Sequence, residues 1–340
     1  MTTTARGAEV GMPLPYSAPD PMDEPTPALD GVTVVIPTKN RAALLRQTLR
    51  SISEQSMLPV EVIVADDGST DDTAQVIDEC GARRLHNPRG DWRPSGARNA
   101  GMLAAKTRYV AFIDSDDLYR PLALERLHAA LTSRADAPFA FGRGLAARLT
   151  PSGWESDGVI APQSWELEDF LCSLYARNSI PSGGGIVNRE RALALGGFDQ
   201  RSVFAQDHAF WLKLARDGEP VYVPELVCIH RRHTGNRMSP IIAADYTPLI
   251  TAVAEEDPRL QRCVPQRLGV QLCEISIDAV HRRSPKGLWM AARRIVKGPQ
   301  RAKMMRSAVT HWRTRKECGR EGSALLRGDT ELRIWLSGYH

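Results

Sequence analysis

Short apolar runs alternate with amphipathic stretches in the N-terminal part of the chain. The apolar runs, which are rich in β-branched residues and typical of buried strands, are 32–36, 60–65 and 109–113. The amphipathic stretches, whose apolar residues recur at helical spacing, are 41–53, 73–80 and 96–105. This alternation predicts βαβ units, and therefore an α/β fold in which helices flank a mostly parallel sheet.

The pattern is looser in the rest of the chain, but further elements are predicted. We expect helices at 121–132, 166–176, 189–195 and 206–215, and strands at 139–141 and 221–230. Residues 1–30 carry six prolines and no hydrophobic period, which predicts a disordered leader. The predicted organisation is a leader (1–30), an α/β domain (31–240) and a basic helical C-terminal extension (241–340).

Polar residues follow each of the three predicted strands, at 37–41, 66–70 and 114–117. In a parallel sheet, ligands bind at the carboxyl ends of the strands, so we expect these segments to share one edge. Asp114 and Asp116 are two positions apart and project to the same side of an extended chain. Such a pair can hold one divalent cation, whose other ligands come from water and substrate phosphates. Asp117 turns away and is predicted to be structural.

Composition places the chain among ordinary globular proteins, with 42% hydrophobic and 25% charged residues over 340 positions. No run approaches the length of a membrane span, and the N-terminus lacks the basic and apolar regions of a signal peptide. The six cysteines are scattered without a Cys-x-x-Cys pair. Reduced thiols in a cytoplasmic protein fit this spacing better than disulfides or structural zinc.

Positive charge is concentrated near the C-terminus, because residues 282–320 hold thirteen Lys and Arg and one acid, Glu317. One interpretation is an amphipathic helix, with Leu288, Trp289 and Met290 among its apolar residues, that lies on the anionic inner face of the membrane. The other, which is commoner, is a solvated or oligomerising face. Nucleic-acid binding is not expected, since no known binding module is evident.

Seven motifs occur in an order that resembles the family 2 glycosyltransferases, which have the GT-A fold. They are Val-Val-Ile-Pro-Thr-Lys-Asn-Arg (34–41), Asp-Asp-Gly-Ser (66–69), Gly-Ala-Arg-Asn-Ala-Gly (96–101), Ile-Asp-Ser-Asp-Asp (113–117), Gly-Gly-Phe-Asp (196–199), Gln-Asp (206–207) and Arg-x-His-x-x-Asn (231–236). The resemblance covers residues 32–240. It implies a nucleotide-binding half (31–120) and an acceptor or catalytic half (121–240).

The resemblance also implies an inverting transfer from a nucleotide-diphosphate sugar, usually a uridine one, with Mg²⁺ or Mn²⁺ as cofactor. The Gln-x-x-Arg-Trp signature of processive members is absent from the sequence, so one sugar is expected per encounter. The acceptor is left open among a glycan, a lipid-linked glycan, a protein and a small metabolite.

By their place in these motifs, several residues take implied roles. Asp116 is the expected metal ligand, supported by Asp114 and His233. Asp67 would receive the N3–H of a uracil. The remaining nucleotide contacts would come from Pro37, Thr38, Asn40, Arg41, Arg98, Asp114 and Ser115. On the acceptor side we expect Trp92, Gly183, Gly184 and Gln206.

The implied reaction needs a base on the face of the sugar opposite the leaving group, and Asp207 is the candidate. Its predicted position at a helix start would lower its pKa, whereas apolar neighbours would raise it. Many family members have Glu-Asp where this chain has Gln206-Asp207. Asp207 could instead be a helix N-cap.

Other residues also have plainer interpretations. Asp66 and Asp67 could simply close a turn, Arg98 could pair with a local acid, and His233 could be a surface residue. Two other protein classes stay open as alternatives: a non-catalytic nucleotide-sugar-binding protein, and a haloacid-dehalogenase-type phosphatase. The second is less favoured, because the residues after Asp116 do not match the pattern of that class.

Overall fold

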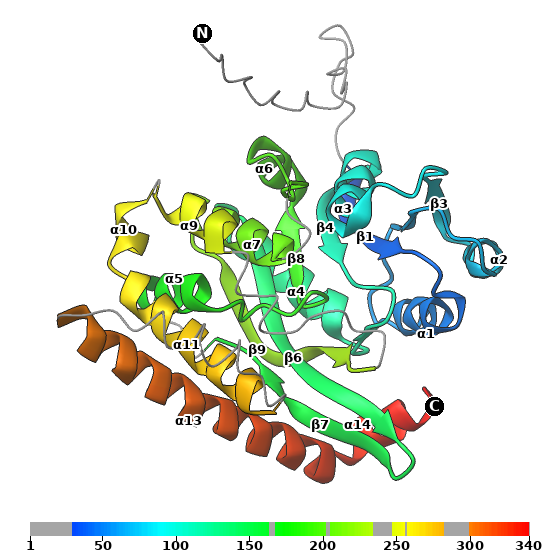
Figure 1. Cartoon of the computed structure of the whole chain (residues 1–340). Coiled ribbons are helices and arrows are strands. Elements are labelled where there is room, and N and C mark those ends of the chain that lie inside the picture. Colours follow the sequence, from blue (N-terminus) through cyan, green and yellow to red (C-terminus); the bar gives the residue numbers. More distant parts are fainter. Residues whose placement is uncertain are drawn as a thin grey trace, which may run out of the picture.

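The computed structural model describes residues 29–162, 167–201, 205–233, 247–255, 257–281 and 299–339. Strands within these ranges form one nine-stranded mixed sheet with helices on both faces (Figure 1). The strands are β1 (Leu29–Thr38), β2 (Glu61–Asp66), β3 (Arg83–His86), β4 (Thr107–Phe112), β5 (Leu118–Tyr119), β6 (Phe139–Thr150), β7 (Gly153–Ile160), β8 (Gly185–Asn188) and β9 (Val221–Arg231).

The helices of the described residues divide between the two faces of the sheet and a C-terminal group. They are α1 (Ala42–Ser53), α2 (Thr73–Glu79), α3 (Arg93–Ala104), α4 (Ala123–Thr132), α5 (Leu167–Ala176), α6 (Arg189–Ala194), α7 (Gln206–Asp217), α9 (Thr247–Glu255), α10 (Pro258–Gln261), α11 (Val264–His281), α13 (Pro299–Gly328) and α14 (Thr330–Ser337). The predicted fold class, a GT-A-like α/β sheet with a helical C-terminal part, is confirmed.

The strand order is β3-β2-β1-β4-β8-β6-β9-β5, and β7 pairs with β6. The pairs β1–β2 and β1–β4 are parallel, as predicted. β3, which was not predicted, adds a further parallel pair with β2. The chain runs outward from β1 to β3 and then returns to the other side of β1 as β4. Ligands bind at such a reversal of strand order, so the carboxyl ends of β1, β2 and β4 mark the expected site.

Alternate residues of β1 enter two different hydrophobic clusters, as a strand buried on both faces requires. Val34 and Ile36 pack with residues of α1, α2 and α4. Val35 packs on the opposite face with residues of α3, α5 and α7, among them Trp211. Gly101 of α3 lets this helix approach the sheet closely, because an added Cβ would lie 2.3 Å from Val35 Cγ1.

Several strands were missed by the sequence prediction. β6 extends to Thr150 and forms a hairpin with β7, whereas only residues 139–141 were expected as a strand. The added part of β6 contains Gly142 and Gly144, which read as loop residues in the sequence. Their Cβ positions would lie within 3 Å of Val227 and Pro181, so these glycines are there for close backbone approach inside the sheet.

The C-terminal helix α13 packs along α11 and against β7 (Figure 1). At one crossing, a Cβ on Gly269 would lie 2.3 Å from the Met304 carbonyl oxygen. The predicted leader and the apolar residues at 288–290 fall largely outside the described residues. Within the described part of the chain, none of the helices is long and apolar enough to cross a membrane.

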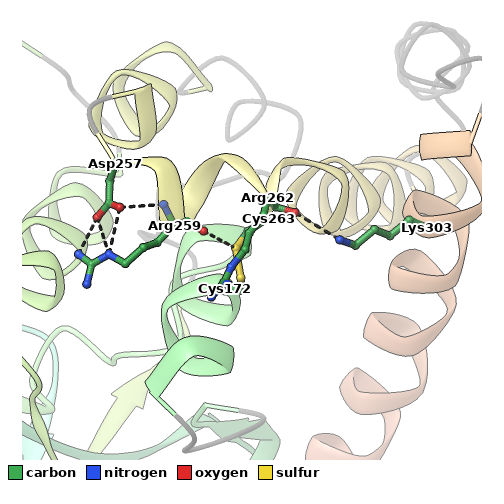
Figure 2. Close-up of a disulfide and its surroundings, with 6 residues drawn as sticks. All are labelled: Cys172, Asp257, Arg259, Arg262, Cys263 and Lys303. Atoms are coloured by element: carbon green, nitrogen blue, oxygen red, sulfur yellow. Dashed lines mark hydrogen bonds and ion pairs between the residues drawn. A yellow bond between two sulfur atoms is a disulfide. The ribbon is translucent and has the colours of Figure 1, made fainter.

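The expectation that every cysteine is reduced is wrong for one pair. Cys172 of α5 and Cys263, between α10 and α11, form a disulfide with their Cα atoms 5.3 Å apart (Figure 2). They are 91 positions apart in sequence, so spacing carried no signal of the pairing. Cys80, Cys228, Cys273 and Cys318 are free thiols. The predicted cytoplasmic location stays a prediction.

Candidate active site

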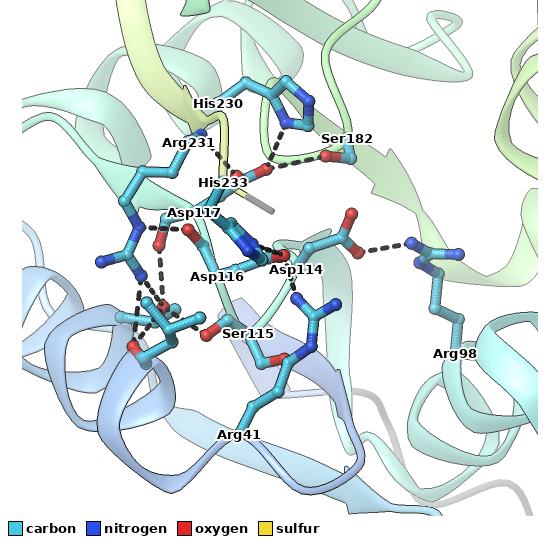
Figure 3. Close-up of polar contacts among 12 residues, drawn as sticks. Arg41, Arg98, Asp114, Ser115, Asp116, Asp117, Ser182, His230, Arg231 and His233 are labelled. Atoms are coloured by element: carbon cyan, nitrogen blue, oxygen red, sulfur yellow. Dashed lines mark hydrogen bonds and ion pairs between the residues drawn. The ribbon is translucent and has the colours of Figure 1, made fainter. Parts of the chain in front are cut away.

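The Asp114–Asp117 turn follows β4 and directs its carboxylates to different partners (Figure 3). Asp114 Oδ1 is 2.5 Å from the Arg98 guanidinium of α3. Asp116 Oδ2 lies 2.8 Å from His233 Nε2 and also forms an ion pair with Arg41. The turn therefore brings together two acids, two arginines and a histidine from four separate segments.

Asp116 is charged in this environment. Its side chain is 9% exposed, and burial is the largest single effect and would raise its pKa. The charge of Arg41 and the hydrogen bond from His233 together outweigh burial, so the pKa of Asp116 lies below its ordinary value.

This donor set fits a divalent cation. A carboxylate and an imidazole that converge are ligands for Mn²⁺, whereas Mg²⁺ favours oxygen alone. In the structure, the Arg41 guanidinium supplies positive charge beside the same carboxylate oxygen. No group of three or more His, Cys, Asp or Glu side chains with metal-binding geometry occurs among the described residues. A cation here would therefore depend on substrate phosphates for much of its coordination.

Asp117 connects the turn to the second half of the domain. Its buried carboxylate accepts hydrogen bonds from Ser182 Oγ (3.0 Å), His230 Nδ1 (3.0 Å) and the Arg231 backbone N–H (2.9 Å). The charge of Asp117 is the main cause that raises the pKa of His230. The structural role expected for Asp117 is thus specific, because its hydrogen bonds tie β9 and the loop before β8 to the Asp114–Asp117 turn.

Arg231 is a site residue whose function the sequence did not reveal. It is 4% exposed, and its guanidinium donates to the Asp116 carbonyl, to Gln47 and to the Leu44 carbonyl (Figure 3). These bonds clamp the Asp114–Asp117 turn against α1. The only sequence signal was the place of Arg231 at the start of the Arg-x-His motif.

The end of β1 contributes Pro37 and Thr38, both buried, and the turn residue Asn40. Thr38 Oγ1 is a buried hydroxyl with no hydrogen-bond partner in the described part of the chain. Asn40 has φ +53°, and its Oδ1 accepts from the Thr70 backbone N–H at 2.7 Å. Asn40 therefore holds the turns after β1 and β2 together. Ser115, within the Asp114–Asp117 turn, is 3% exposed, and its carbonyl accepts from Thr48 Oγ1 at 3.0 Å.

Asp67 holds the loop between β3 and α3 in place through hydrogen bonds. It is 6% exposed and accepts from Asn87 Nδ2 (2.9 Å) and from the backbone N–H groups of Trp92 (2.9 Å) and Arg93 (3.1 Å). A carboxylate has about four acceptor sites, so one remains on Asp67 for a further donor. Asp66, by contrast, pairs with Arg84 at 2.5 Å, which agrees with its plainer structural interpretation.

Asp207 lies in the first turn of α7, as predicted. The N-cap of α7 is Ala205, so the alternative interpretation of Asp207 as the cap is wrong. Its Oδ2 accepts from Asn178 Nδ2 at 2.8 Å. Asn178 was missed, because it is 29 positions away in sequence and no local pattern marks it.

The pKa of Asp207 is subject to opposed effects, and the effect of burial is the larger. Burial is the largest cause and raises the pKa, while the charge of Arg98 lowers it and that of Asp114 raises it. The net effect is a raised pKa. The charges of Arg98 and Asp114 reach Asp207, so Asp207 lies near the Asp114–Asp117 turn.

The residues expected on the acceptor side differ in exposure. Trp92 is half-buried and is the N-cap residue of α3. Gly183 and Gly184 are buried, and a Cβ at Gly184 would lie 2.2 Å from Pro181 Cγ. Gln206 is 5% exposed. The two glycines therefore allow tight packing of the loop that carries Ser182, rather than presenting open backbone.

The fold is that of a GT-A-like α/β domain, with an acidic turn after β4. Residues 33–144 match the family model described as glycosyl transferase family 2. This part of the chain is a glycosyl transferase family 2 domain, as the sequence motifs implied. The match leaves the phosphatase alternative without support.

Relatives of known activity align with the N-terminal part of the chain. GalNAc(5)-diNAcBac-PP-undecaprenol beta-1,3-glucosyltransferase of Campylobacter jejuni is 29% identical over 43% of this chain and 50% of its own length. Validoxylamine A glucosyltransferase of Streptomyces hygroscopicus subsp. limoneus is 35% identical over 36% of this chain and 28% of its own length. The chain thus spans half or less of the length of these relatives.

Solved structures share the fold over most of the chain. S. aureus TarS 1–349 in complex with UDP-GlcNAc superposes with a TM-score of 0.60 and 18% identity, over 86% of this chain and 92% of that one. The mannosyltransferase PcManGT of Pyrobaculum calidifontis, in complex with GDP-Man and Mn²⁺, has a TM-score of 0.50 and 21% identity over 86% of this chain and 91% of its own. At these identities the likeness shows the fold alone.

Proposed function

We propose that the protein is an inverting glycosyltransferase that moves one sugar from a uridine-diphosphate sugar to an acceptor hydroxyl. The observation that carries this proposal is the cluster of charges around the Asp114–Asp117 turn. Arg41 and His233 contact Asp116, Arg98 contacts Asp114, and the charges of Arg98 and Asp114 act on the half-buried Asp207. A donor diphosphate, its cation and an acceptor base need this set of charges in one place.

The nucleoside would lie between the ends of β1 and β2. Asp67 has acceptor capacity left for the N3–H of a uracil, and the unpartnered hydroxyl of Thr38 offers a donor at the same edge. Arg98 and Arg41 would face the diphosphate, since guanidinium groups bind phosphate oxygens well. TarS, which has the same fold, was solved with UDP-GlcNAc.

Asp116, Asp114 and His233 would hold a divalent cation, with Mn²⁺ the better match to a donor set that includes imidazole. When bound, this ion neutralises the negative charge that develops on the leaving diphosphate. PcManGT, of the same fold, was solved with Mn²⁺ and a nucleotide sugar.

Asp207 would act as the general base. The acceptor oxygen forms a bond to the anomeric carbon as the bond from that carbon to the diphosphate oxygen breaks, so the configuration inverts. The acceptor proton passes to the Asp207 carboxylate, which Asn178 orients through its 2.8 Å hydrogen bond. The raised pKa of Asp207 makes it a stronger base than a solvated aspartate.

The test compares binding and turnover in Asp207→Asn, with Asp157→Asn of β7 as the matched control. UDP-sugars with Mn²⁺ are expected to stabilise the wild type and both variants in a thermal-shift assay. Release of UDP from the donor should fall by about 10²-fold or more in Asp207→Asn alone. Stabilisation without UDP release in any of the three proteins would instead favour a non-catalytic binding protein. Equal UDP release in all three would assign the base to another residue. The absence of any stabilisation, tested also with GDP- and dTDP-sugars, would refute the nucleotide-sugar proposal.

A further inference from the structure

The outward side of α13 carries a surface that the proposed transfer reaction does not use. The inward side of this helix is buried through Met304, Ala308 and His311. It is held against α11 by the Ser307 Oγ hydrogen bond to the Gln266 carbonyl at 3.0 Å. Near Cys263, Lys303 Nζ donates to the Arg262 carbonyl at 3.3 Å (Figure 2). α13 is therefore a helix docked on the domain, with its other side open to solvent.

An apolar stripe runs along this open side. Met305 is 41% exposed, Val309 47% and Trp312 44%, and they lie at i, i+4 and i+7, which places them on one face. Single exposed apolar side chains are normal in globular proteins. Three large ones in helical register form a patch, and such patches mark interaction sites.

Cations border the stripe. Arg306, Arg313, Lys316 and Arg320 of α13 are exposed, and Lys316 Nζ lies 3.8 Å from the centroid of the Trp312 ring. Two acids lie near these cations on α13. Glu321 forms an ion pair with Arg143 of β6, and Glu317 is an exposed acid between Lys316 and Arg320. The combination of an apolar stripe with a row of Lys and Arg is typical of helices that lie on anionic lipid.

A second copy of the chain fits this surface poorly. A two-fold contact places the same patch on both subunits, so the arginine rows would face each other across the interface. Like charges brought together in this way oppose association. An anionic bilayer offers both a negative surface and an apolar boundary for the stripe.

We propose that the outward face of α13, formed by Met305, Val309, Trp312 and their flanking cations, docks the protein on an anionic lipid bilayer. Trp312 lies at headgroup depth, where its amphipathic ring is favoured. Arg313 and Lys316 meet lipid phosphates. The domain is then held at the membrane by one side of α13.

The test is flotation of the full chain with vesicles of phosphatidylglycerol and phosphatidylcholine, compared with phosphatidylcholine alone. The wild type should float only with the anionic vesicles, and less so as salt is raised. Trp312→Glu, and separately Arg313→Glu with Lys316→Glu, should weaken binding about tenfold. The matched controls Ile334→Glu and Arg333→Glu, at exposed positions of α14, should bind as the wild type does.

Three outcomes would overturn the proposal. One is equal flotation with neutral and anionic vesicles. Another is wild-type binding by the α13 variants, which would assign the lipid contact to a different segment. The third is a wild-type dimer in sedimentation analysis that Trp312→Glu converts to a monomer, which would assign the stripe to self-association. Because all the substituted side chains are exposed, each variant should retain the wild-type melting temperature, and UDP-sugar stabilisation should be unchanged.

Discussion

Replacing Asn178 with alanine tests how the structure sets the basicity of Asp207. Asn178 Nδ2 donates to Asp207 Oδ2 at 2.8 Å, and its own Oδ1 accepts from the Ile180 backbone N–H at 3.1 Å. This second bond fixes the amide so that its NH₂ group, and not its oxygen, faces the carboxylate. Asn178 therefore stabilises the ionised form of Asp207.

The size of the effect follows from this hydrogen bond. A hydrogen bond to a charged group contributes about 1.5–3 kcal/mol. One pKa unit corresponds to about 1.4 kcal/mol, so Asn178→Ala should raise the pKa of Asp207 by about 1–2 units. Burial already holds this pKa above its ordinary value, and the loss of a donor acts in the same direction. A general base must be ionised, so turnover in the variant should begin to fall at a higher pH.

The assay is the pH dependence of UDP release under saturating donor, measured on the acid side of the optimum. Asn178→Ala should shift the acid limb upward by about 1–2 pH units. Ser179→Ala is the matched control, because Ser179 is the buried neighbour whose Oγ has no hydrogen-bond partner among the described residues. An acid limb that coincides in the wild type and Asn178→Ala would refute the reasoning, since Asn178 would then not act on the ionisation that governs turnover.

Further predictions concern stability. Burial lowers the pKa of His208 from 6.5 to about 3, so the unfolded chain takes up a proton before the folded one, and stability is lost as the pH falls below about 6.5. Between pH 7 and pH 5 the wild type should lose about 2 kcal/mol more unfolding free energy than His208→Asn in urea titrations, and equal losses would contradict a buried neutral imidazole. Replacing Cys172 and Cys263 with serine should lower stability by about 2–4 kcal/mol, and thiol counting of the unreduced wild type should find four free groups rather than six. Gly101→Ala should cost about 1–3 kcal/mol, because the new Cβ would overlap Val35, and a melting temperature equal to that of the wild type would show that the helix can shift at no cost.

The sequence by itself determined the parallel half of the fold. The β-branched runs that became β1, β2 and β4 alternate with amphipathic helices, and this local pattern has few solutions other than βαβ units. Since parallel strands end at one edge, it also followed that the polar residues after them would meet there. The prediction failed for β6 and β7, because Gly142 and Gly144 read as loop residues until their close neighbours in the sheet are known.

Only the tertiary structure decided how the site is held and charged. The helix start and the apolar neighbours of Asp207 act in opposite directions on its pKa. Burial decides that this pKa is raised, and the extent of burial depends on packing between distant segments. The partners Asn178 for Asp207 and Arg231 for Asp116, like the Cys172–Cys263 disulfide, join positions from 29 to 115 residues apart. Contacts of this kind leave no periodic signal in one sequence, because they arise from how elements pack rather than from the pattern within any of them.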